Sequence, residues 1–316
     1  MTQLVVKTAR QRRDAGGHAL LFLCVSFGAA CGTSQDEPGA SVSQYVSDSQ
    51  CATCHSDQTD EWTGSHHDLA MQLATEDTVL GDFNDAIFED SGVTTRFFTR
   101  AGSYLIEAEG SDGATAEFKV AYTFGVEPLQ QYLIEFPGGR LQALTVAWDT
   151  VDKRWYDLYP DQRLAADDPL HWTGRLQTWN TMCAECHSTA LVKGYDPSTD
   201  TFNTTWEALD VGCQACHGAG ADHIAWAESE EPSDDLGLSI SLHRGDLGEQ
   251  LNVCAPCHSR RATLTSEASR GGELLDLYAP SRIQDGLYHS DGQILEEVYV
   301  YGSFMQSLMS QRGVTC

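Results

Sequence analysis

The sequence predicts an α+β fold that is mostly helical and irregular, with an antiparallel β insert. Short Cys-x-x-Cys-His segments lie in helical or irregular stretches before and after the insert. Between about residues 81 and 160 the cysteines stop, and runs of β-branched and aromatic residues alternate with Gly-containing turns. The expected organisation is a signal peptide at 1–30, a linker at 31–50, a first segment at 51–80, the β-rich insert at 81–160 and a last segment at 161–316.

The charge of the chain limits its partners. Its 316 residues carry a formal net charge of −27, which excludes nucleic acid as a partner because phosphate backbones are bound by cationic surfaces. An acidic surface favours partner proteins that have a basic docking face. Solubility alone would explain the charge equally well.

The N-terminus has the features of an export signal. A basic stretch at 7–13 precedes an apolar run at 19–30, which is too short for a lasting membrane span. The small residues before Cys31 and the polar residues after it resemble a bacterial lipoprotein cleavage site, although Gly28 stands where Leu is usual. We therefore expect an exported protein, periplasmic or in the cell envelope, with a lipid anchor at Cys31. The alternatives are a plain signal peptide and an uncleaved anchor.

One pattern, Cys-x-x-Cys-His, occurs four times, at 51–55, 183–187, 213–217 and 254–258. Two thiols three residues apart can each form a thioether with one haem vinyl group, and the next histidine can then bind the iron. The sequence predicts four covalently attached c-type haems. The expected attachment residues are Cys51, Cys54, Cys183, Cys186, Cys213, Cys216, Cys254 and Cys257, with His55, His187, His217 and His258 as proximal iron ligands.

Zinc is the alternative for these cysteines, because two Cys-x-x-Cys pairs can also make a four-thiolate site. Zinc does not need a histidine after every pair, and the chance of finding four is on the order of one in a million. The remaining cysteines of the 11 are Cys24 in the apolar run, Cys31 and Cys316. If Cys31 is lipidated, no pair of cysteines is left for a disulfide. This supports the haem interpretation, because free thiols in an exported protein would otherwise be expected to form disulfides.

Secondary-structure signals concentrate in the predicted insert. We expect four to six strands that serve as scaffold rather than as a substrate-binding module. The expected strand segments are 94–100 and 103–109 around Ala101-Gly102, 116–124, and 131–136 and 140–148 around Pro137-Gly138-Gly139. A short helix is expected at 65–74, with Ser65 as its N-cap.

Each iron needs a second axial ligand besides its proximal histidine. Outside the leader and the motifs there are six histidines, and the preferred distal ligands are His67, His171, His223 and His289, followed by His66 and then His243. At least two of the six must have another role, for example as surface residues. Four distal histidines would make every haem bis-histidine and low-spin.

Several segments resemble the cytochrome c-554-related multihaem family, in the branch whose longer members add tetratricopeptide repeats. They are 62–71 after the first motif, 168–172, 213–220 with His223, and 301–304 with 313–316. The resemblance implies a mostly helical, irregular multihaem cytochrome fold with haems packed in close pairs that carry electrons, and His67, His171 and His223 as distal ligands. The chain departs from that branch because it has no tetratricopeptide repeats.

Two functions follow from these features. The first is an exported electron carrier with four haems; the second is a fragment of a multihaem oxidoreductase acting on a small nitrogen or sulfur compound. Such an enzyme needs an iron with an open distal site, and six spare histidines for four irons favour the carrier, so no catalytic residue is assigned. Cys316 occupies the place where related proteins begin another motif. We therefore expect a truncated version of a longer cytochrome, with a fifth haem if the chain continues past Cys316.

Overall fold

The computed structural model describes residues 44–230, 234, 236–240, 242, 246–265 and 272–315. The predictions for the signal peptide, for lipidation of Cys31, for His243 and for Cys316 lie outside these residues.

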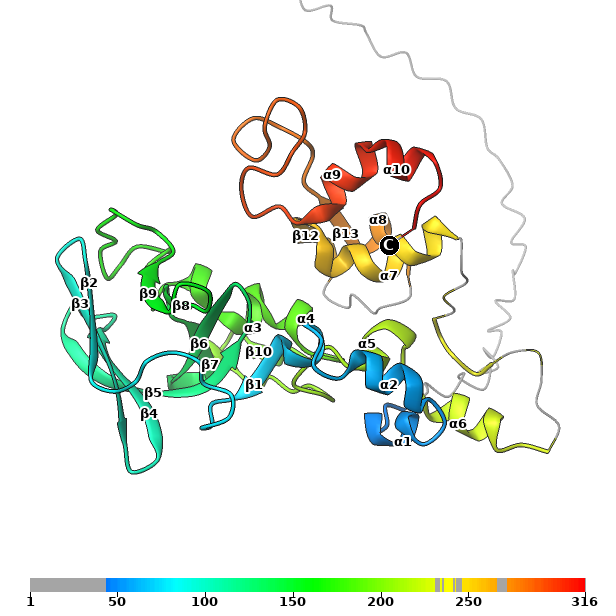
Figure 1. The fold of residues 1–316 in the computed structure, drawn as a ribbon, viewed down its shortest axis with the longest axis horizontal. Helices are drawn as coiled ribbons and strands as arrows, with labels where there is room; N and C mark the ends of the chain where they lie inside the picture. Colours follow the sequence, from blue (N-terminus) through cyan, green and yellow to red (C-terminus); the bar gives the residue numbers. More distant parts are fainter. Residues whose placement is uncertain are drawn as a thin grey trace, which may run out of the picture. The chain divides into compact units, whose positions relative to one another are not determined.

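The main element is a nine-stranded antiparallel sheet in the order β2-β3-β4-β5-β6-β8-β9, with β1 paired to β5 and β7 paired to β6 (Figure 1). Short connections join most consecutive strands, so the sheet is largely built from neighbours in sequence. Its strands are β1 Met71–Leu73, β2 Ala86–Asp90, β3 Val93–Arg100, β4 Ser103–Glu109, β5 Thr115–Phe124, β6 Leu129–Phe136, β7 Arg140–Ala143, β8 Val146–Asp149 and β9 Arg154–Asp157.

Turn chemistry sets the register of the sheet. Ala101 and Gly102 have φ angles of 49° and 77°, and two consecutive positive φ angles match the twist of a two-residue hairpin. This turn places Arg100 opposite Ser103 and fixes the pairing of β3 with β4. The three residues 137–139 likewise connect β6 to β7. Both hairpins lie where the sequence predicted them.

Aromatic side chains form the core of the sheet. Phe97 and Trp155 stack with ring centroids 3.5 Å apart, and Phe83 packs edge-on against both rings. A Cβ at position 81 would lie 2.5 Å from the Tyr132 hydroxyl oxygen and 2.7 Å from the Trp155 ring, so only glycine fits there. The Gly81 amide instead donates a hydrogen bond to the Tyr132 hydroxyl at 3.0 Å.

Replacement of Trp155 by alanine tests the importance of this core. Trp155 is 9% exposed and contacts Phe97, so we expect its truncation to lower the free energy of unfolding by about 3–5 kcal/mol. Val151 lies in the connection that leads to β9, the strand of Trp155, and is 65% exposed. Val151→Ala should therefore change the free energy of unfolding by less than about 0.5 kcal/mol. Denaturant unfolding measures both variants. Equal losses would show that this cluster does not stabilise the sheet.

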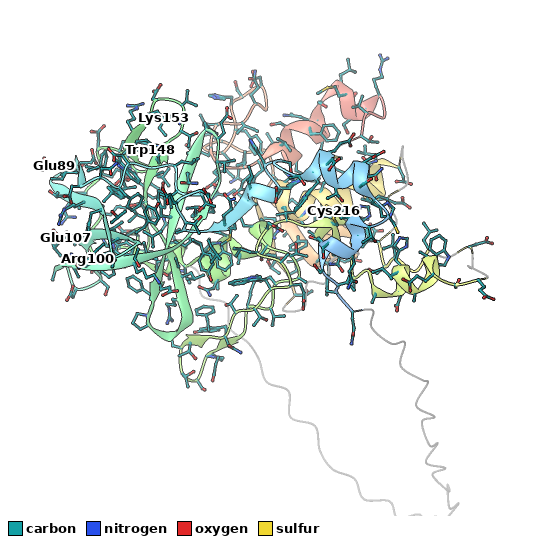
Figure 2. The ribbon with its side chains drawn as sticks, turned by 60° about the horizontal axis from the view of Figure 1, so that its bottom comes forward. Glu89, Arg100, Glu107, Trp148, Lys153 and Cys216 are labelled. Atoms are coloured by element: carbon teal, nitrogen blue, oxygen red, sulfur yellow. The ribbon has the colours of Figure 1, made fainter. Side chains whose placement is uncertain are left out.

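Charged side chains cover the outer surface of the sheet, as Figure 2 shows for Glu89, Arg100 and Glu107. Arg100 forms a bidentate pair with Glu117, at 2.6 and 2.8 Å. The pair is exposed, so it contributes little to stability. These contacts keep a polar surface over the aromatic core.

The helices are short, and most of them follow the sheet in sequence. None of those described is long and apolar enough to cross a membrane. They are α1 Asp48–Ala52, α2 Ser56–Trp62, α3 Trp179–Met182, α4 Ala184–His187, α5 Cys213–His217, α6 Ala221–Ala227, α7 Leu247–His258, α8 Leu274–Leu277, α9 Val300–Gln306 and α10 Leu308–Gln311. Two-stranded ladders pair β10 Tyr195–Asp196 with β11 Thr201–Phe202, and β12 Arg261–Thr263 with β13 Tyr278–Pro280.

The prediction of a mostly helical fold is wrong. The described residues are 26% helical and 27% strand, and the nine-stranded sheet exceeds the four to six strands expected. The physical reason is that most helices end after one or two turns, whereas the strands extend the sheet through antiparallel pairing. The predicted helix at 65–74 is also wrong, because only Asp68–Ala70 forms a 3-10 turn before Met71–Leu73 pairs with β5.

Candidate haem sites

Each Cys-x-x-Cys-His motif lies at a helix. In the last three motifs the histidine is the final helical residue, of α4, α5 and α7. In the first motif α1 contains Cys51, and His55 precedes α2. Residues three apart on one helical turn share a face, so the two thiols of a motif can reach one ligand together. None of the eight motif cysteines, all of them among the described residues, forms a disulfide.

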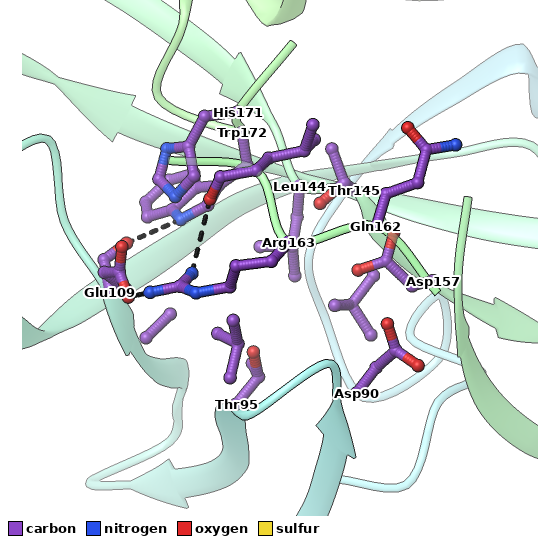
Figure 3. Close-up of a pocket in the computed structure, with 14 residues that line it drawn as sticks. Asp90, Thr95, Glu109, Leu144, Thr145, Asp157, Gln162, Arg163, His171 and Trp172 are labelled. Atoms are coloured by element: carbon purple, nitrogen blue, oxygen red, sulfur yellow. Dashed lines mark hydrogen bonds and ion pairs between the residues drawn. The ribbon is translucent and has the colours of Figure 1, made fainter. Parts of the chain in front are cut away.

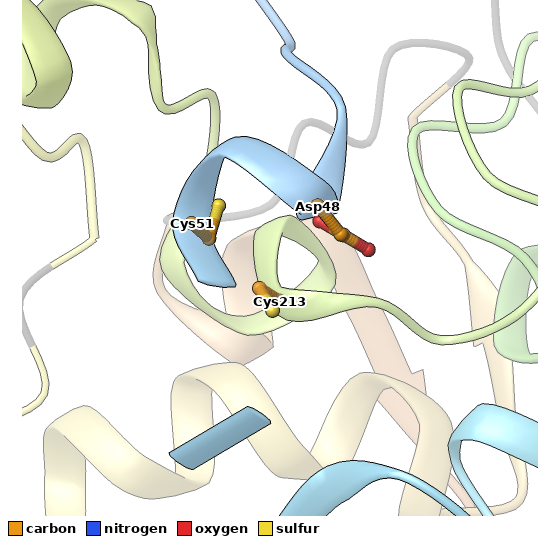
Figure 4. Close-up of side chains that lie close together, drawn as sticks. All are labelled: Asp48, Cys51 and Cys213. Carbon is orange, nitrogen blue, oxygen red and sulfur yellow. The ribbon is translucent and has the colours of Figure 1, made fainter. Parts of the chain in front are cut away.

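The first and third motifs lie side by side. The Sγ atoms of Cys51 and Cys213 and a carboxylate oxygen of Asp48 lie within 4.8 Å of one another (Figure 4). Gln214 links the same two segments, because its side chain accepts a hydrogen bond from the Val46 amide at 2.9 Å and donates to the Val46 carbonyl at 2.6 Å. Burial raises the pKa of the Cys213 thiol to about 11, with the Asp48 carboxylate adding to the effect.

This cluster argues against a four-thiolate zinc site. Zinc between two Cys-x-x-Cys pairs needs both thiols of each pair in one tetrahedron. Here each motif contributes one cysteine, and among the described residues no other group of three or more ligating side chains lies so close. Thioether bonds to haem do not require the thiols to converge on one point, because each thiol bonds to a separate vinyl group. The cysteines therefore fit covalently attached haem better than zinc.

Two acidic side chains, Asp48 within this cluster and Asp210 near it, are partly buried. One carboxylate oxygen of Asp48 and one of Asp210 are buried without a hydrogen-bond partner among the described residues. Burial, reinforced by the negative charges of Asp48 and Asp68, raises the pKa of Asp210 to about 6. Sequence reasoning missed both aspartates, because acidic residues are common throughout this chain.

The second and fourth motifs also meet. The thiols of Cys186 and Cys257 are hydrogen-bonded, and this contact and burial raise the pKa of Cys186. The Cys186 thiol also lies 3.9 Å from the Pro256 carbonyl oxygen. Burial raises the pKa of Cys183 to about 12. The four motifs thus form two pairs, the first with the third and the second with the fourth.

Two pairs of histidines face each other across a distance that suits one metal ion. The ring centroids of His55 and His223 are 6.2 Å apart with planes 24° from parallel, and those of His67 and His258 are 6.1 Å apart at 74°. An imidazole nitrogen binds a metal at about 2 Å and lies about 1.1 Å from its ring centre, so two axial imidazoles have centres about 6.2 Å apart. Both pairs match this separation, and each joins a motif histidine to a predicted distal one.

Hydrogen bonds orient two of the rings. The Nδ1–H of His223 donates to the Leu236 carbonyl at 2.8 Å, and the Nδ1–H of His187 donates to the Ala70 carbonyl at 3.3 Å. A ring held in this way presents its other nitrogen, Nε2, for ligation. Burial lowers the pKa of His187, His217 and His258, with neighbouring histidines adding to the effect at the last two. The neutral ring is the form that binds metal.

His171 lies in the sheet region, and no described contact joins it to a motif residue. It is 6% exposed and lines a pocket of about 50 Å³ beside Trp172, Glu109 and Arg163 (Figure 3). Its Nδ1 is 2.8 Å from the Thr173 hydroxyl oxygen, and the Arg163 guanidinium lies 2.7 Å from the Glu109 carboxylate. Burial lowers the pKa of His171. The structure therefore brings His67 and His223, but not His171, to motif histidines.

His289 and His66 are exposed. His289 occupies a turn in which its backbone amide donates to the Gln293 carbonyl at 2.9 Å. No described ring contact joins either histidine to a motif residue. Sequence reasoning missed Glu185, Arg261 and Tyr278, which connect the second and fourth motifs. The sequence did offer a signal: Glu185 lies within the second motif, and the pair Arg260-Arg261 follows the fourth motif in a chain with few cationic residues.

Comparisons with known proteins find one family model and two solved structures that resemble this chain. The sequence model of the family described as "Cytochrome c554 and c-prime" matches residues 50–84 and 153–218, which contain the first three motifs. No curated protein matches the sequence. The fold is similar to that of the Outer Cell Wall Cytochrome OcwA, with a TM-score of 0.55 and 18% identity over 83% of this chain and 51% of that one. An undecahaem cytochrome from the S-layer of Carboxydothermus ferrireducens matches with a TM-score of 0.41 and 18% identity, over 72% of this chain and 29% of that one. This chain thus spans about half the length of the OcwA chain.

Proposed function

We propose that this protein is an exported multihaem c-type cytochrome that carries electrons through four covalently attached haems. The observation that supports it most strongly is that the ring centroids of His223 and His67 lie about 6 Å from those of motif histidines, a separation compatible with two imidazoles on one metal ion. The family match over the first three motifs and the fold shared with an outer cell wall cytochrome support it independently.

The ligand assignment follows from the two histidine pairs. His55 and His223 would bind one iron, and His67 and His258 a second. His187 and His217 would bind the other two, and we propose His171 and His289 as their distal ligands. The paired motifs would place the first haem beside the third and the second beside the fourth, because Cys51 meets Cys213 and Cys186 meets Cys257.

When bound, haem supplies reversible one-electron chemistry, and the protein determines where that chemistry occurs. The motif cysteines fix each attachment point. The carbonyls of Leu236 and Ala70 hold the rings of His223 and His187 in the ligating orientation. The short helices keep the motif pairs in contact, which shortens the path between neighbouring sites. The residues His55, His217 and His258 are only partly covered by the protein, so a macrocycle can reach them.

Partners and location follow from charge and relatives. A net charge of −27 suits redox partner proteins with a basic docking face. The outer cell wall protein with the similar fold, together with the N-terminal signal, supports export to the periplasm or cell envelope, with a lipid anchor at Cys31 as the proposed attachment.

Haem counting tests the proposal directly. A pyridine haemochrome assay on protein matured with a c-type haem ligation system should give about four haems per chain, one per motif. Denaturing gels stained for haem peroxidase activity should show that the haem stays attached. Zinc in place of iron, or one haem or none per chain, would contradict the proposal.

An oxidoreductase acting on a small nitrogen or sulfur compound is the second candidate. The observation in its favour is at His187, whose ring packs edge-on against the apolar ring of Phe124 at 5.6 Å, while no second imidazole faces it in the described residues. An iron there with a displaceable ligand would give a high-spin signal in the resting protein. Turnover of nitrite, hydroxylamine or tetrathionate together with that signal would favour this function over electron transfer.

A further inference from the structure

Besides the thiol contact, a compact polar cluster connects the second and fourth motifs. Its centre is Glu185, which lies within the second motif between Cys183 and Cys186. The Tyr278 hydroxyl donates to one Glu185 carboxylate oxygen at 2.5 Å, and the Arg261 guanidinium lies 3.3 Å from the other. All three side chains are largely withdrawn from solvent, and Tyr278 is 2% exposed.

Arg261 contacts both motifs. Its Nε donates to the Pro256 carbonyl at 2.8 Å, inside the fourth motif, and its Nη2 lies 3.9 Å from the Cys186 sulfur, in the second. The guanidinium also lies over the Tyr278 ring, 4.2 Å from its centre. The Arg261 side chain is 12% exposed, so its charge is screened much less than that of a surface arginine.

Charges of both signs meet around Glu185. The Glu185 carboxylate is shared between Arg261 and the ammonium group of Lys193, which lies at 3.6 Å. A further anion acts here, because the negative charge of Glu297 affects Cys183 and His187 of the second motif. Arg261 is the cation of this cluster that contacts both motifs. Reduction of a haem adds one electron, so a nearby cation stabilises the reduced state and raises the reduction potential, and a nearby anion lowers it.

We infer that Glu185, Arg261 and Tyr278 form a clamp that holds the second and fourth motifs together, and that Arg261 raises the reduction potential of the haems attached there. Arg261 would not bind iron itself. Its charge would act on the haems through space, from a position next to the Cys186 sulfur. The inference rests on the proposed function, because it requires haem at both motifs.

Replacing Arg261 by glutamine tests the charge. At an effective dielectric constant of about 20, a unit charge about 10 Å away changes a one-electron equilibrium by about tenfold. We expect Arg261→Gln to lower the midpoint potentials of the two haems attached at the second and fourth motifs. The reduction equilibrium of each should change by about tenfold, as measured in a spectroscopically monitored redox titration. Glu185→Gln removes the anion and should shift the same two upward.

Two further variants separate charge from folding. Arg100→Gln makes the same change in net charge at the exposed pair with Glu117 on the sheet, and should leave every potential unchanged. Arg261→Lys keeps the charge but loses the planar contact with Tyr278, so it should restore most of the potential while losing stability. A purely structural clamp would give no opposite shifts for Arg261→Gln and Glu185→Gln.

The outcomes distinguish failure of the proposed function from failure of the role of Arg261. Fewer than four haems in the unmodified protein would contradict the proposed function. With four haems present, potentials in Arg261→Gln equal to those in Arg100→Gln would overturn the role of Arg261. If Arg261→Gln does not fold, Glu185→Gln and Arg261→Lys still test the charge, and a downward or absent shift in Glu185→Gln would overturn the inference.

Discussion

Replacing Cys183 and Cys186 by alanine is expected to remove one haem and to destabilise the whole protein. Under the proposed function each motif attaches one haem, so the haem content should fall from about four to about three per chain. The second motif is also part of the core next to the sheet: Ala184 is fully buried in a cluster with Trp179 and Leu133, and Cys183 packs against that cluster. A haem lost at this position leaves apolar surface without a partner, which should cost about 3 kcal/mol or more.

Replacing Cys51 and Cys54 by alanine provides the matched comparison. This variant should also lose one haem, but α1 and α2 around the first motif contain no buried residue, so its free energy of unfolding should fall much less. Haem staining and denaturant unfolding of both variants measure the two effects separately. Equal destabilisation, or loss of no haem in either variant, would contradict the assignment.

The spacing that predicts the attachment sites is a local feature of the sequence. A spacing of three residues between cysteines places both thiols on one helical turn, whatever surrounds that turn. The hairpin at Ala101-Gly102 was predictable for the same reason, since positive φ angles in a two-residue turn require particular residues.

The fold class was not predictable because part of the sheet depends on distant pairing. The strand β1 is three residues long, too short to show an alternating pattern, and its partner residues in β5 lie about 50 positions later. The segment 65–74 has helical spacing of its apolar residues, but pairing with β5 satisfies the backbone of Met71–Leu73 and ends the helical turn at Ala70. Tertiary contact therefore overrode local preference.

The pairing of histidines could not be derived from sequence either. His55 and His67 are near neighbours in the chain, yet His55 faces His223 and His67 faces His258. Contacts between distant segments hold His67 in place: the Val211 amide donates to the His67 carbonyl at 3.1 Å, and the Trp62 indole donates to the Val211 carbonyl at 3.1 Å. Such contacts leave no signal in the spacing of histidines.

Replacing His67 by alanine is expected to convert one of the four proposed haems from low-spin to high-spin. His67 is the ring that faces His258 at 6.1 Å, so its removal would leave one iron without a protein ligand on its distal side. About a quarter of the iron should then give a high-spin signal in the electron paramagnetic resonance spectrum, with the haem content unchanged because the cysteines are intact.

The neighbouring histidine gives a control of the same size and type. His66 is exposed, and no described ring contact joins it to a motif, so His66→Ala should leave all haems low-spin. Added imidazole should restore the low-spin spectrum of His67→Ala, because a free ring can occupy the vacated position without being attached to the chain. A structural disturbance would not be reversed in this way. If His67→Ala stays fully low-spin, or if His66→Ala gives the same high-spin signal, His67 does not bind the iron attached at the fourth motif.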